Sequence, residues 1–242
     1  MPVQFNISIA NKVIGVTTFY DFTYHLCKNY LTDVPCDFHV LVTKEDIQYE
    51  REMSKKSQDY SDSYLESLAV YRGIATKMLT YDTLLFHGSA IAVDGEAYLF
   101  AAKSGMGKST HTRMWMEHFG SRAVMINDDK PLLKFAEERI YVCGTPWDGK
   151  HRLSSNISVP LKAIAILERD MSNHISRIDK RSAFPILIQQ SFRPRDTGAL
   201  MKTTGLVDRL GNNVELYRLG CNMQPEAVDV SYNGMNERNI KS

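Results

Sequence analysis

A glycine-bearing turn between an apolar run and a polar helix start is the feature that most limits how this chain can fold. The run at 98–102 reads Tyr-Leu-Phe-Ala-Ala, the turn Lys-Ser-Gly-Met-Gly follows, and Lys-Ser-Thr then leads into a predicted helix that ends at Phe119. Consecutive backbone amides of such a turn can point inward around an anion, and the helix N-terminus adds a partial positive charge. The sequence therefore predicts a strand–loop–helix unit that holds a phosphate group.

The residue types of this loop suit the phosphates of ATP and a magnesium ion. Glycine lets the backbone approach phosphate closely, Lys108 supplies a mobile cation, and the Ser109 hydroxyl is a hard oxygen that suits Mg²⁺. The longer form of this motif begins with another glycine, and here Ala102 stands in its place. The alternative is an ordinary strand-to-helix loop with a surface lysine. The predicted nucleotide-binding residues are Ser104, Gly105, Met106, Gly107, Lys108, Ser109 and Thr110.

Composition narrows the classes of partner. The chain has 242 residues and a net charge of +1, so no overall basic field favours binding to nucleic acid. No apolar run approaches the roughly 18 residues that cross a bilayer, which predicts no membrane segment. The widely spaced cysteines favour reduced thiols in a cytoplasmic protein over a disulfide framework or zinc site. They are Cys27, Cys36, Cys143 and Cys221.

The chain divides in the sequence at a polar, highly charged stretch. Residues 2–20 and 37–43 are rich in β-favouring types, and 44–63, which includes Lys55-Lys56, is typical of a solvated helix or loop. We therefore expect a small N-terminal α/β segment over 1–60, a candidate for substrate recognition, and a catalytic domain over 61–242.

Alternating helices and strands are predicted beyond the division. The spacing over 62–79 predicts a helix with one apolar face, on which the tyrosines are packing residues. That face comprises Tyr64, Leu68, Tyr71, Ala75 and Met78. Asp94-Gly95 between two β-rich runs predicts a hairpin whose second arm leads into the glycine turn. Further strands are expected at 122–127, 132–135, 140–143, 161–168 and 214–219, and helices at 180–192, 196–211 and 225–235. The pattern is that of an α/β protein.

Asp128 and Asp129 follow the predicted strand at 122–127, where an open α/β sheet presents ligand-binding ends. An apolar strand that ends in aspartate suits a Mg²⁺ ligand, and phosphoryl transfer also needs a group that positions the acceptor hydroxyl. Ser109 and Asp128 are the predicted metal ligands, but the residues leave open which aspartate is linked to the metal and which serves as the base. The alternative is a solvated turn at a strand end.

Cations and aromatic residues elsewhere have both functional and structural interpretations. The turn Lys150-His151-Arg152 has two interpretations. It is a clamp that binds a γ-phosphate or an acidic acceptor, or it is a solvated basic turn. Trp147 could stack on a ring, although an anchor in the core is its commoner role. Arg193 and Arg195 could contact nucleotide or simply end a helix. A metal site at His111, Trp115 and His118 is disfavoured.

Several of these runs together resemble the catalytic domain of HPr kinase/phosphorylase, a family in the phosphoenolpyruvate-carboxykinase-like branch of P-loop proteins. The runs are 87–91, 102–109 and 127–129 with the Asp-Gly hairpin, over about residues 84–170. The run 144–151 is similar to one in small bacterial relatives, some of which modify ribosomally made peptides. The resemblance implies a P-loop kinase domain with a mixed central sheet flanked by helices.

The resemblance also implies roles for particular residues. His87, Lys108, Asp128 and Asp129 would be catalytic, and the protein would self-associate. The resulting expectation is an ATP- and Mg²⁺-dependent kinase that transfers the γ-phosphate to a serine hydroxyl of a peptide or protein. The alternatives are a nucleotide-binding regulatory module without phosphotransfer and a kinase of small molecules. Hydride transfer is disfavoured, because Lys-Ser follows Gly-Met-Gly where a dinucleotide fingerprint would have a third glycine.

Overall fold

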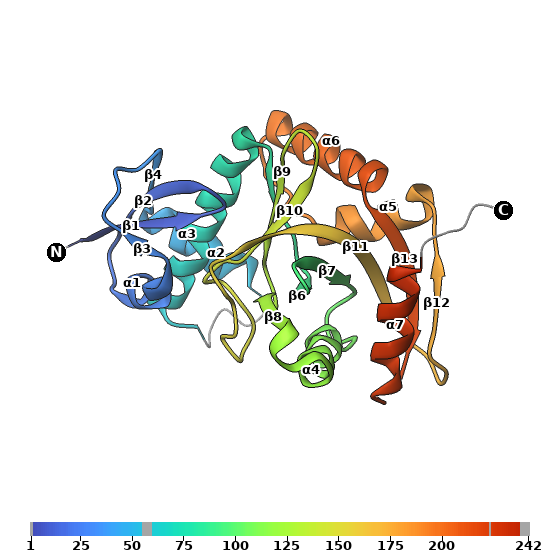
Figure 1. Ribbon diagram of the computed structural model, residues 1–242. Helices are drawn as coiled ribbons and strands as arrows, with labels where there is room; N and C mark the ends of the chain where they lie inside the picture. Colours follow the sequence, from blue (N-terminus) through green and yellow to red (C-terminus); the bar gives the residue numbers. More distant parts are fainter. Residues whose placement is uncertain (1, 55–59, 223, 238–242) are drawn as a thin grey trace.

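Two sheets of different size organise the chain in the computed structural model, which describes residues 2–54, 60–222 and 224–237 (Figure 1). The predicted basic pair Lys55-Lys56 lies outside these residues. The smaller sheet has the strand order β3-β1-β2-β4. Its strands are β1 (Val3–Ile9), β2 (Lys12–Thr18), β3 (Leu31–Thr32) and β4 (Phe38–Leu41). The strands expected over 2–20 and 37–43 are therefore confirmed.

The larger sheet is curled and mixed. Nine strands take part, in the order β5-β9-β10-β11-β7-β6-β8, with β13 beside β11 and β12 beside β13. The central strand β11 runs parallel to β7 and β13, whereas its pairing with β10 is antiparallel. The strands are β5 (Thr83–Leu85), β6 (Ser89–Val93), β7 (Glu96–Ala101), β8 (Ala123–Asn127), β9 (Leu132–Phe135), β10 (Ile140–Cys143), β11 (Ser158–Arg169), β12 (His174–Arg177) and β13 (Glu215–Cys221).

The predicted hairpin before the glycine turn is confirmed. Val93 of β6 pairs with Glu96 of β7, so Asp94 and Gly95 form a two-residue turn. Both turn residues have positive φ, 52° and 83°, which matches the turn type that suits the twist of a hairpin. The second arm, β7, leads directly into the glycine turn.

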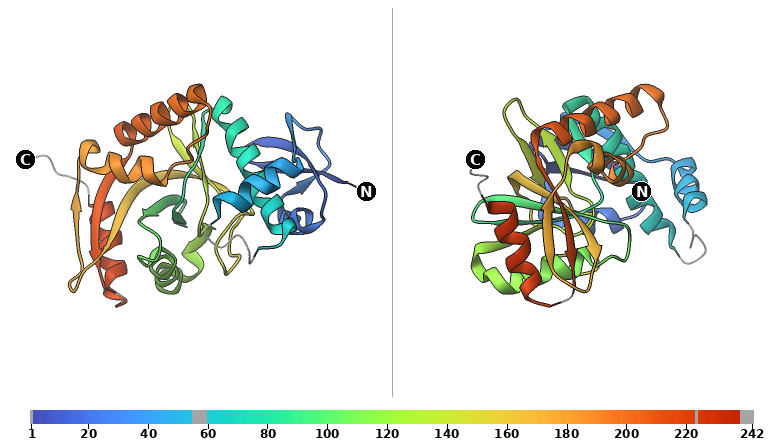
Figure 2. Two further views of the ribbon diagram at one scale, coloured as in Figure 1. Left: turned by 180° about the vertical axis from the view of Figure 1, so that it is seen from behind. Right: turned by 90° about the vertical axis from the view of Figure 1, so that its right-hand side faces the viewer.

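Helices cover both faces of the larger sheet, as Figures 1 and 2 show. Along β7, Leu99 joins the core beneath α5 and α6, whereas Tyr98 and Phe100 join the core beneath α4 and α7. This alternation follows from the two-residue period of a strand. The helices are α4 (Lys108–Phe119), α5 (Lys180–Gln190), α6 (Thr197–Asn213) and α7 (Glu226–Asn236). The predicted α/β arrangement with a mixed sheet flanked by helices is confirmed.

A third core joins the small sheet to the rest of the chain. It combines Ile7, Ile14 and Val16 of the small sheet with residues of α3 (Asp62–Met78) and with Trp147. Although α3 follows the predicted division at residue 60, it shares a core with the N-terminal strands, and the division remains a prediction. The other helical segments are α1 (Phe22–Leu26), α2 (Lys44–Met53), η1 (Lys28–Tyr30), η3 (Leu79–Tyr81) and η4 (Gly120–Arg122).

The apolar face of α3 is wider than the sequence spacing indicated. Tyr71, Ala75 and Met78 are buried as expected, and so are Leu65 and Ile74 from outside the predicted face. The helix is covered both by the small sheet and by the region around Trp147, which explains the breadth of its buried surface. Tyr64 and Leu68 are only half-buried.

The cysteines are all free, with Cys36 exposed and the other three buried. Among the described residues, no helix combines the length and the apolar character that a membrane span requires.

A buried histidine on α4 gives a prediction about stability. His111 is 2% exposed, and burial lowers the pKa of its imidazole to about 4 from the ordinary 6.5. The unfolded chain therefore takes up a proton on this residue at a higher pH than the folded chain does. We expect the free energy of unfolding to fall by about 3 kcal/mol from this residue as the pH decreases from 6.5 towards 4. Urea unfolding across this range, compared with His111→Gln, measures it; parallel curves would contradict the prediction.

Candidate nucleotide-binding site

The glycine turn has the backbone shape that a phosphate loop needs. Gly105 and Gly107 have φ values of 79° and 104°, which strain any residue with a Cβ atom. Gly107 is the N-cap of α4, and the amide of Met106 donates to the carbonyl of Lys103 across the turn. The loop thus ends at the N-terminus of a 12-residue helix, whose partial positive charge faces the space that the loop encloses.

Lys108 lies folded back over this loop. Its Nζ donates to the carbonyl oxygen of Ala102 at 3.0 Å, and the residue is only 8% exposed. Burial lowers the pKa of Lys108, while the charges of Asp129 and Asp128 act in the opposite direction. The ammonium is therefore partly desolvated close to both carboxylates, a position from which it could turn to a phosphate oxygen.

Asp128 follows the end of β8 and is held by hydroxyl groups. Its Oδ1 accepts a hydrogen bond from Ser89 Oγ at 2.6 Å, and Ser89 Oγ lies 2.8 Å from Thr112 Oγ1. These contacts link the carboxylate to β6 and to α4, the helix that also carries Ser109. Asp128 is 5% exposed, so it is fixed rather than freely solvated.

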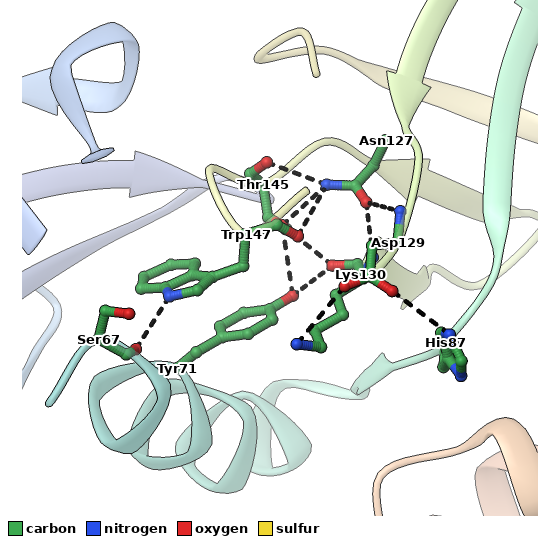
Figure 3. Close-up of polar contacts among 8 residues, drawn as sticks. All are labelled: Ser67, Tyr71, His87, Asn127, Asp129, Lys130, Thr145 and Trp147. Atoms are coloured by element: carbon green, nitrogen blue, oxygen red, sulfur yellow. Dashed lines mark hydrogen bonds and ion pairs between the residues drawn. The ribbon is translucent and has the colours of Figure 1, made fainter. Parts of the chain in front are cut away.

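Asp129 faces a histidine and a lysine instead (Figure 3). Its Oδ1 lies 3.3 Å from Nε2 of His87, and its Oδ2 lies 3.5 Å from Nζ of Lys130. Burial raises the pKa of Asp129, but the hydrogen bond from His87 and the charge of Lys130 outweigh it, so the pKa is lowered overall. This carboxylate is therefore ionised at neutral pH and able to accept a hydrogen bond from a hydroxyl.

A network of buried polar groups fixes the turn that carries both aspartates, as Figure 3 shows. Oδ1 of Asn127 accepts hydrogen bonds from the amides of Asp129 at 2.8 Å and Lys130 at 2.6 Å. The Asn127 side-chain amide donates to the carbonyl of Thr145 at 3.0 Å. The hydroxyl of Tyr71 donates to the carbonyl of Lys130 at 2.6 Å. The helical spacing predicts only packing for Tyr71 and does not indicate this polar role.

Trp147 anchors the loop between β10 and β11 to α3. Its ring stacks on that of Tyr71 with centroids 4.3 Å apart, and its Nε1 donates to the carbonyl of Ser67 at 2.9 Å. The residue is 5% exposed. Between the two roles considered for Trp147, these contacts favour the anchor, and they hold one side of the cleft in place (Figure 3).

Most of the predicted site residues line a single cleft of about 800 Å³. In Figure 1 the loop between β10 and β11 lies between α1 and α4. Hard oxygens of Ser109 and Asp128 are among the lining groups and are the donor type that Mg²⁺ prefers. The lining residues predicted from the sequence are His87, Ser104, Gly105, Gly107, Lys108, Ser109, Thr110, Asp128, Asp129, Lys150, His151 and Arg152.

Met106 does not line this cleft. The positive φ values on both sides of it turn its side chain to a separate cavity of about 510 Å³ beside Met114 and Leu167. Its amide is already paired within the turn. Arg195 also lies elsewhere, with its guanidinium 3.5 Å from the ring centroid of Tyr49.

Two cations of the cleft were not among the predicted site residues. Lys130 follows the aspartate pair directly, and Arg169 ends β11 and donates from its guanidinium to the carbonyl of Gly105 at 2.9 Å. The signal for Arg169 was its place at the carboxyl end of a strand that runs parallel to β7, because such ends meet at one edge of the sheet.

Within the described residues there is no group of three or more histidine, cysteine, aspartate or glutamate side chains that could hold a metal ion. A magnesium ion that is bound mainly by phosphate oxygens and water needs only one or two protein oxygens. Ser109 and Asp128 fit such an ion, since both line the cleft beside the loop.

The comparisons with known proteins add little to this geometry. No family model matches the sequence, and no curated protein matches it. Among solved structures, the chain is similar to the HPr(Ser) kinase/phosphatase from Coxiella burnetii, with a TM-score of 0.35 and 9% sequence identity. That match covers 62% of this chain and 95% of the other. What the site can do is therefore inferred from its own residues.

The close approach of Gly149 to Asp128 gives a second prediction. A Cβ atom on Gly149 would lie 2.7 Å from Oδ2 of Asp128, so Gly149→Ala must displace a carboxylate that Ser89 holds on its other side. For the phosphate transfer proposed below, we expect a rate about a hundredfold lower, because small displacements of catalytic groups have effects of this size, and little change in stability. Steady-state kinetics and thermal unfolding measure the two effects.

Gly205→Ala on exposed α6 is the matched control, because its Cβ would meet nothing within 4 Å. This variant should keep full activity. Equal activities for the two variants would contradict the assigned position of Asp128.

Proposed function

We propose that this protein is an ATP- and Mg²⁺-dependent phosphotransferase that moves the γ-phosphate to a hydroxyl group, that of a serine in a peptide or protein. One observation carries the proposal: the glycine loop, Lys108 and both aspartates line the same cleft. A module that only binds nucleotide needs the loop and the lysine. It has no need of a second carboxylate that is aligned by a histidine.

The loop and its cations would bind the triphosphate. The amides at the N-terminus of α4 and the ammonium of Lys108 meet the β- and γ-phosphates, and Lys108 exchanges its hydrogen bond to Ala102 for a phosphate oxygen. These groups are in place before the reaction, so they stabilise the charge that develops in the transition state without reorganising. Lys150, His151 and Arg152, at the exposed side of the cleft, supply further charge for the γ-phosphate.

Ser109 and Asp128 would hold the magnesium ion. When bound, the ion would neutralise charge on the phosphate that is transferred. Ser89 orients the Asp128 carboxylate through its hydroxyl, and Thr112 orients Ser89 in turn. These buried hydroxyl groups would keep the Asp128 carboxylate in one position when nucleotide enters the cleft.

Asp129 would accept a hydrogen bond from the hydroxyl group of the acceptor. His87 holds one carboxylate oxygen at 3.3 Å, and Asn127 fixes the backbone of the same residue. The lowered pKa of Asp129 makes it an orienting acceptor more than a strong base, which suits phosphoryl transfer through a loose transition state. This assigns the two carboxylates different roles.

The same proposal extends to the domain level. Residues 61–242 would form a P-loop kinase domain of the HPr kinase type, with 1–60 as an accessory segment and the chain as a homo-oligomer. The shared hydrophobic core of α3 and the small sheet supports a fixed position for the accessory segment beside the cleft.

Transfer from γ-labelled ATP tests the proposal. The protein is incubated with Mg²⁺, labelled ATP and a pool of serine-containing peptides, while calorimetry measures nucleotide binding in parallel. We expect label on peptide serine and one ADP for each phosphate transferred. Nucleotide binding with neither ADP nor labelled acceptor would instead identify a regulatory module. Label on sugars or other small alcohols alone would identify a small-molecule kinase.

A further inference from the structure

We propose that Phe22, Leu26, Tyr64 and Leu68, called here the apolar wall, form the acceptor site of the cleft and bind an apolar side chain beside the acceptor serine of a peptide. The inference rests on the phosphotransfer function proposed above. It adds the chemical class of the acceptor and the residues that select it.

The apolar wall is built from two helix faces that meet over the cleft. Phe22 and Leu26 lie four residues apart on α1, and Tyr64 and Leu68 lie four residues apart on α3, so each pair shares one face of its helix. The rings of Phe22 and Tyr64 meet edge to face, with centroids 6.3 Å apart. All four side chains are half-buried and line the same cleft as the glycine loop.

A buried carboxylate holds the wall in position. Glu66 is 0% exposed, and its two oxygens accept hydrogen bonds from the amides of Phe19 at 2.5 Å and Tyr20 at 3.2 Å. Burying a carboxylate is costly unless its hydrogen bonds compensate, and here they fix the backbone that enters α1. The apolar wall is therefore a surface whose backbone is held in place by hydrogen bonds, and not a loop whose apolar side chains happen to be exposed.

The loop between β10 and β11 is tied to the same unit. The hydroxyl of Tyr30 donates to Ser154 Oγ at 3.4 Å, and Trp147 is anchored on α3 as described above. The cationic turn at 150–152 and the apolar wall thus belong to one framework, and the acceptor meets both when it enters the cleft.

The residues that line the cleft fall into two chemical classes, one suited to the phosphate donor ATP and the other to the phosphate acceptor. A triphosphate needs cations and amides, and these come from the glycine loop, Lys108 and Arg169. Apolar side chains make no favourable contact with a polyanion. A ligand that covers half-exposed apolar surface within a binding cleft removes that surface from water, which favours binding. His87 and Asp129, assigned to the acceptor hydroxyl, line the cleft together with this wall.

Peptide binding to the nucleotide-loaded protein tests this assignment. Calorimetry compares two heptapeptides, one with leucine on both sides of a central serine and one with glycine there, in the presence of Mg²⁺ and a non-hydrolysable ATP analogue. We expect the leucine peptide to bind at least about tenfold more tightly, the discrimination typical of an apolar pocket. Phe22→Ala and Leu68→Ala should each remove most of this preference and leave the affinity for the analogue unchanged.

Tyr24→Ala is the matched control on α1. Tyr24 packs on Phe5, with ring centroids 5.5 Å apart, and is not part of the cleft lining, so this variant should keep the preference. Equal or absent binding of both peptides, or a preference that survives in both wall variants, overturns the assignment. A loss of affinity for the ATP analogue in the wall variants also overturns the assignment, because it would mean that the apolar wall binds the nucleobase. A parent protein that fails to bind the analogue at all refutes the phosphotransfer function itself.

Discussion

Replacing Lys108 with methionine is expected to lower phosphate transfer from ATP by about a thousandfold or more. The ammonium lies against the loop, where it donates to the carbonyl of Ala102 at 3.0 Å, and single charges placed in this way supply such factors in phosphoryl transfer. Methionine fills similar space, and removing a partly desolvated charge should not lower the stability of the fold. Initial rates at saturating ATP, together with thermal unfolding, separate the two effects.

Lys103→Met is the control for this substitution. Lys103 stands in the same loop and is exposed, and its side chain does not line the cleft. Its methionine variant should transfer phosphate at close to the parental rate. A Lys108→Met protein with parental turnover would mean that the loop does not bind the transferred phosphate.

Asp129→Asn is expected to have the second large effect, a loss of about a hundredfold to ten-thousandfold in the transfer rate. The amide is isosteric, but it is a weaker acceptor than a carboxylate that His87 and Lys130 keep ionised. The affinity for ATP should not fall, because the substitution removes a negative charge from a cleft that receives a polyanion. Rates and nucleotide binding are measured on the same preparation.

Asp94→Asn provides the comparison for this variant. Asp94 pairs with Arg122 in the exposed hairpin turn and has a positive φ of 52°, which asparagine tolerates. It should retain parental rates. If Asp129→Asn also does, another group orients the acceptor hydroxyl, and the division of roles between the two aspartates is wrong.

Local signals predicted the central part of the fold well. The Asp-Gly hairpin, the strand after the loop helix and the later helices follow from short-range patterns, namely turn residues and apolar runs. The same locality explains why the glycine turn and Asp128-Asp129 could be selected from the sequence alone. They are adjacent in space because β7 and β8 both run antiparallel to β6, which places the carboxyl ends of β7 and β8 at the same edge of the sheet.

Backbone conformation and long-range contacts account for what the residue patterns do not predict. Met106 belongs to the motif, but two positive φ values turn its side chain out of the cleft, and no residue pattern reports that rotation. Tyr71 fits an apolar helix face, yet its hydroxyl meets Lys130, 59 positions away in sequence. The short α1 was not predicted, since its position depends on the carboxylate of Glu66 from another helix.

A structure of the protein with Mg²⁺ and a non-hydrolysable ATP analogue tests the central claim most directly. We expect the β- and γ-phosphates against the amides at the start of α4, with Lys108 turned from Ala102 to a phosphate oxygen and the metal near Ser109 and Asp128. A triphosphate bound elsewhere, with the glycine turn and the Lys108–Ala102 hydrogen bond unchanged, would contradict it.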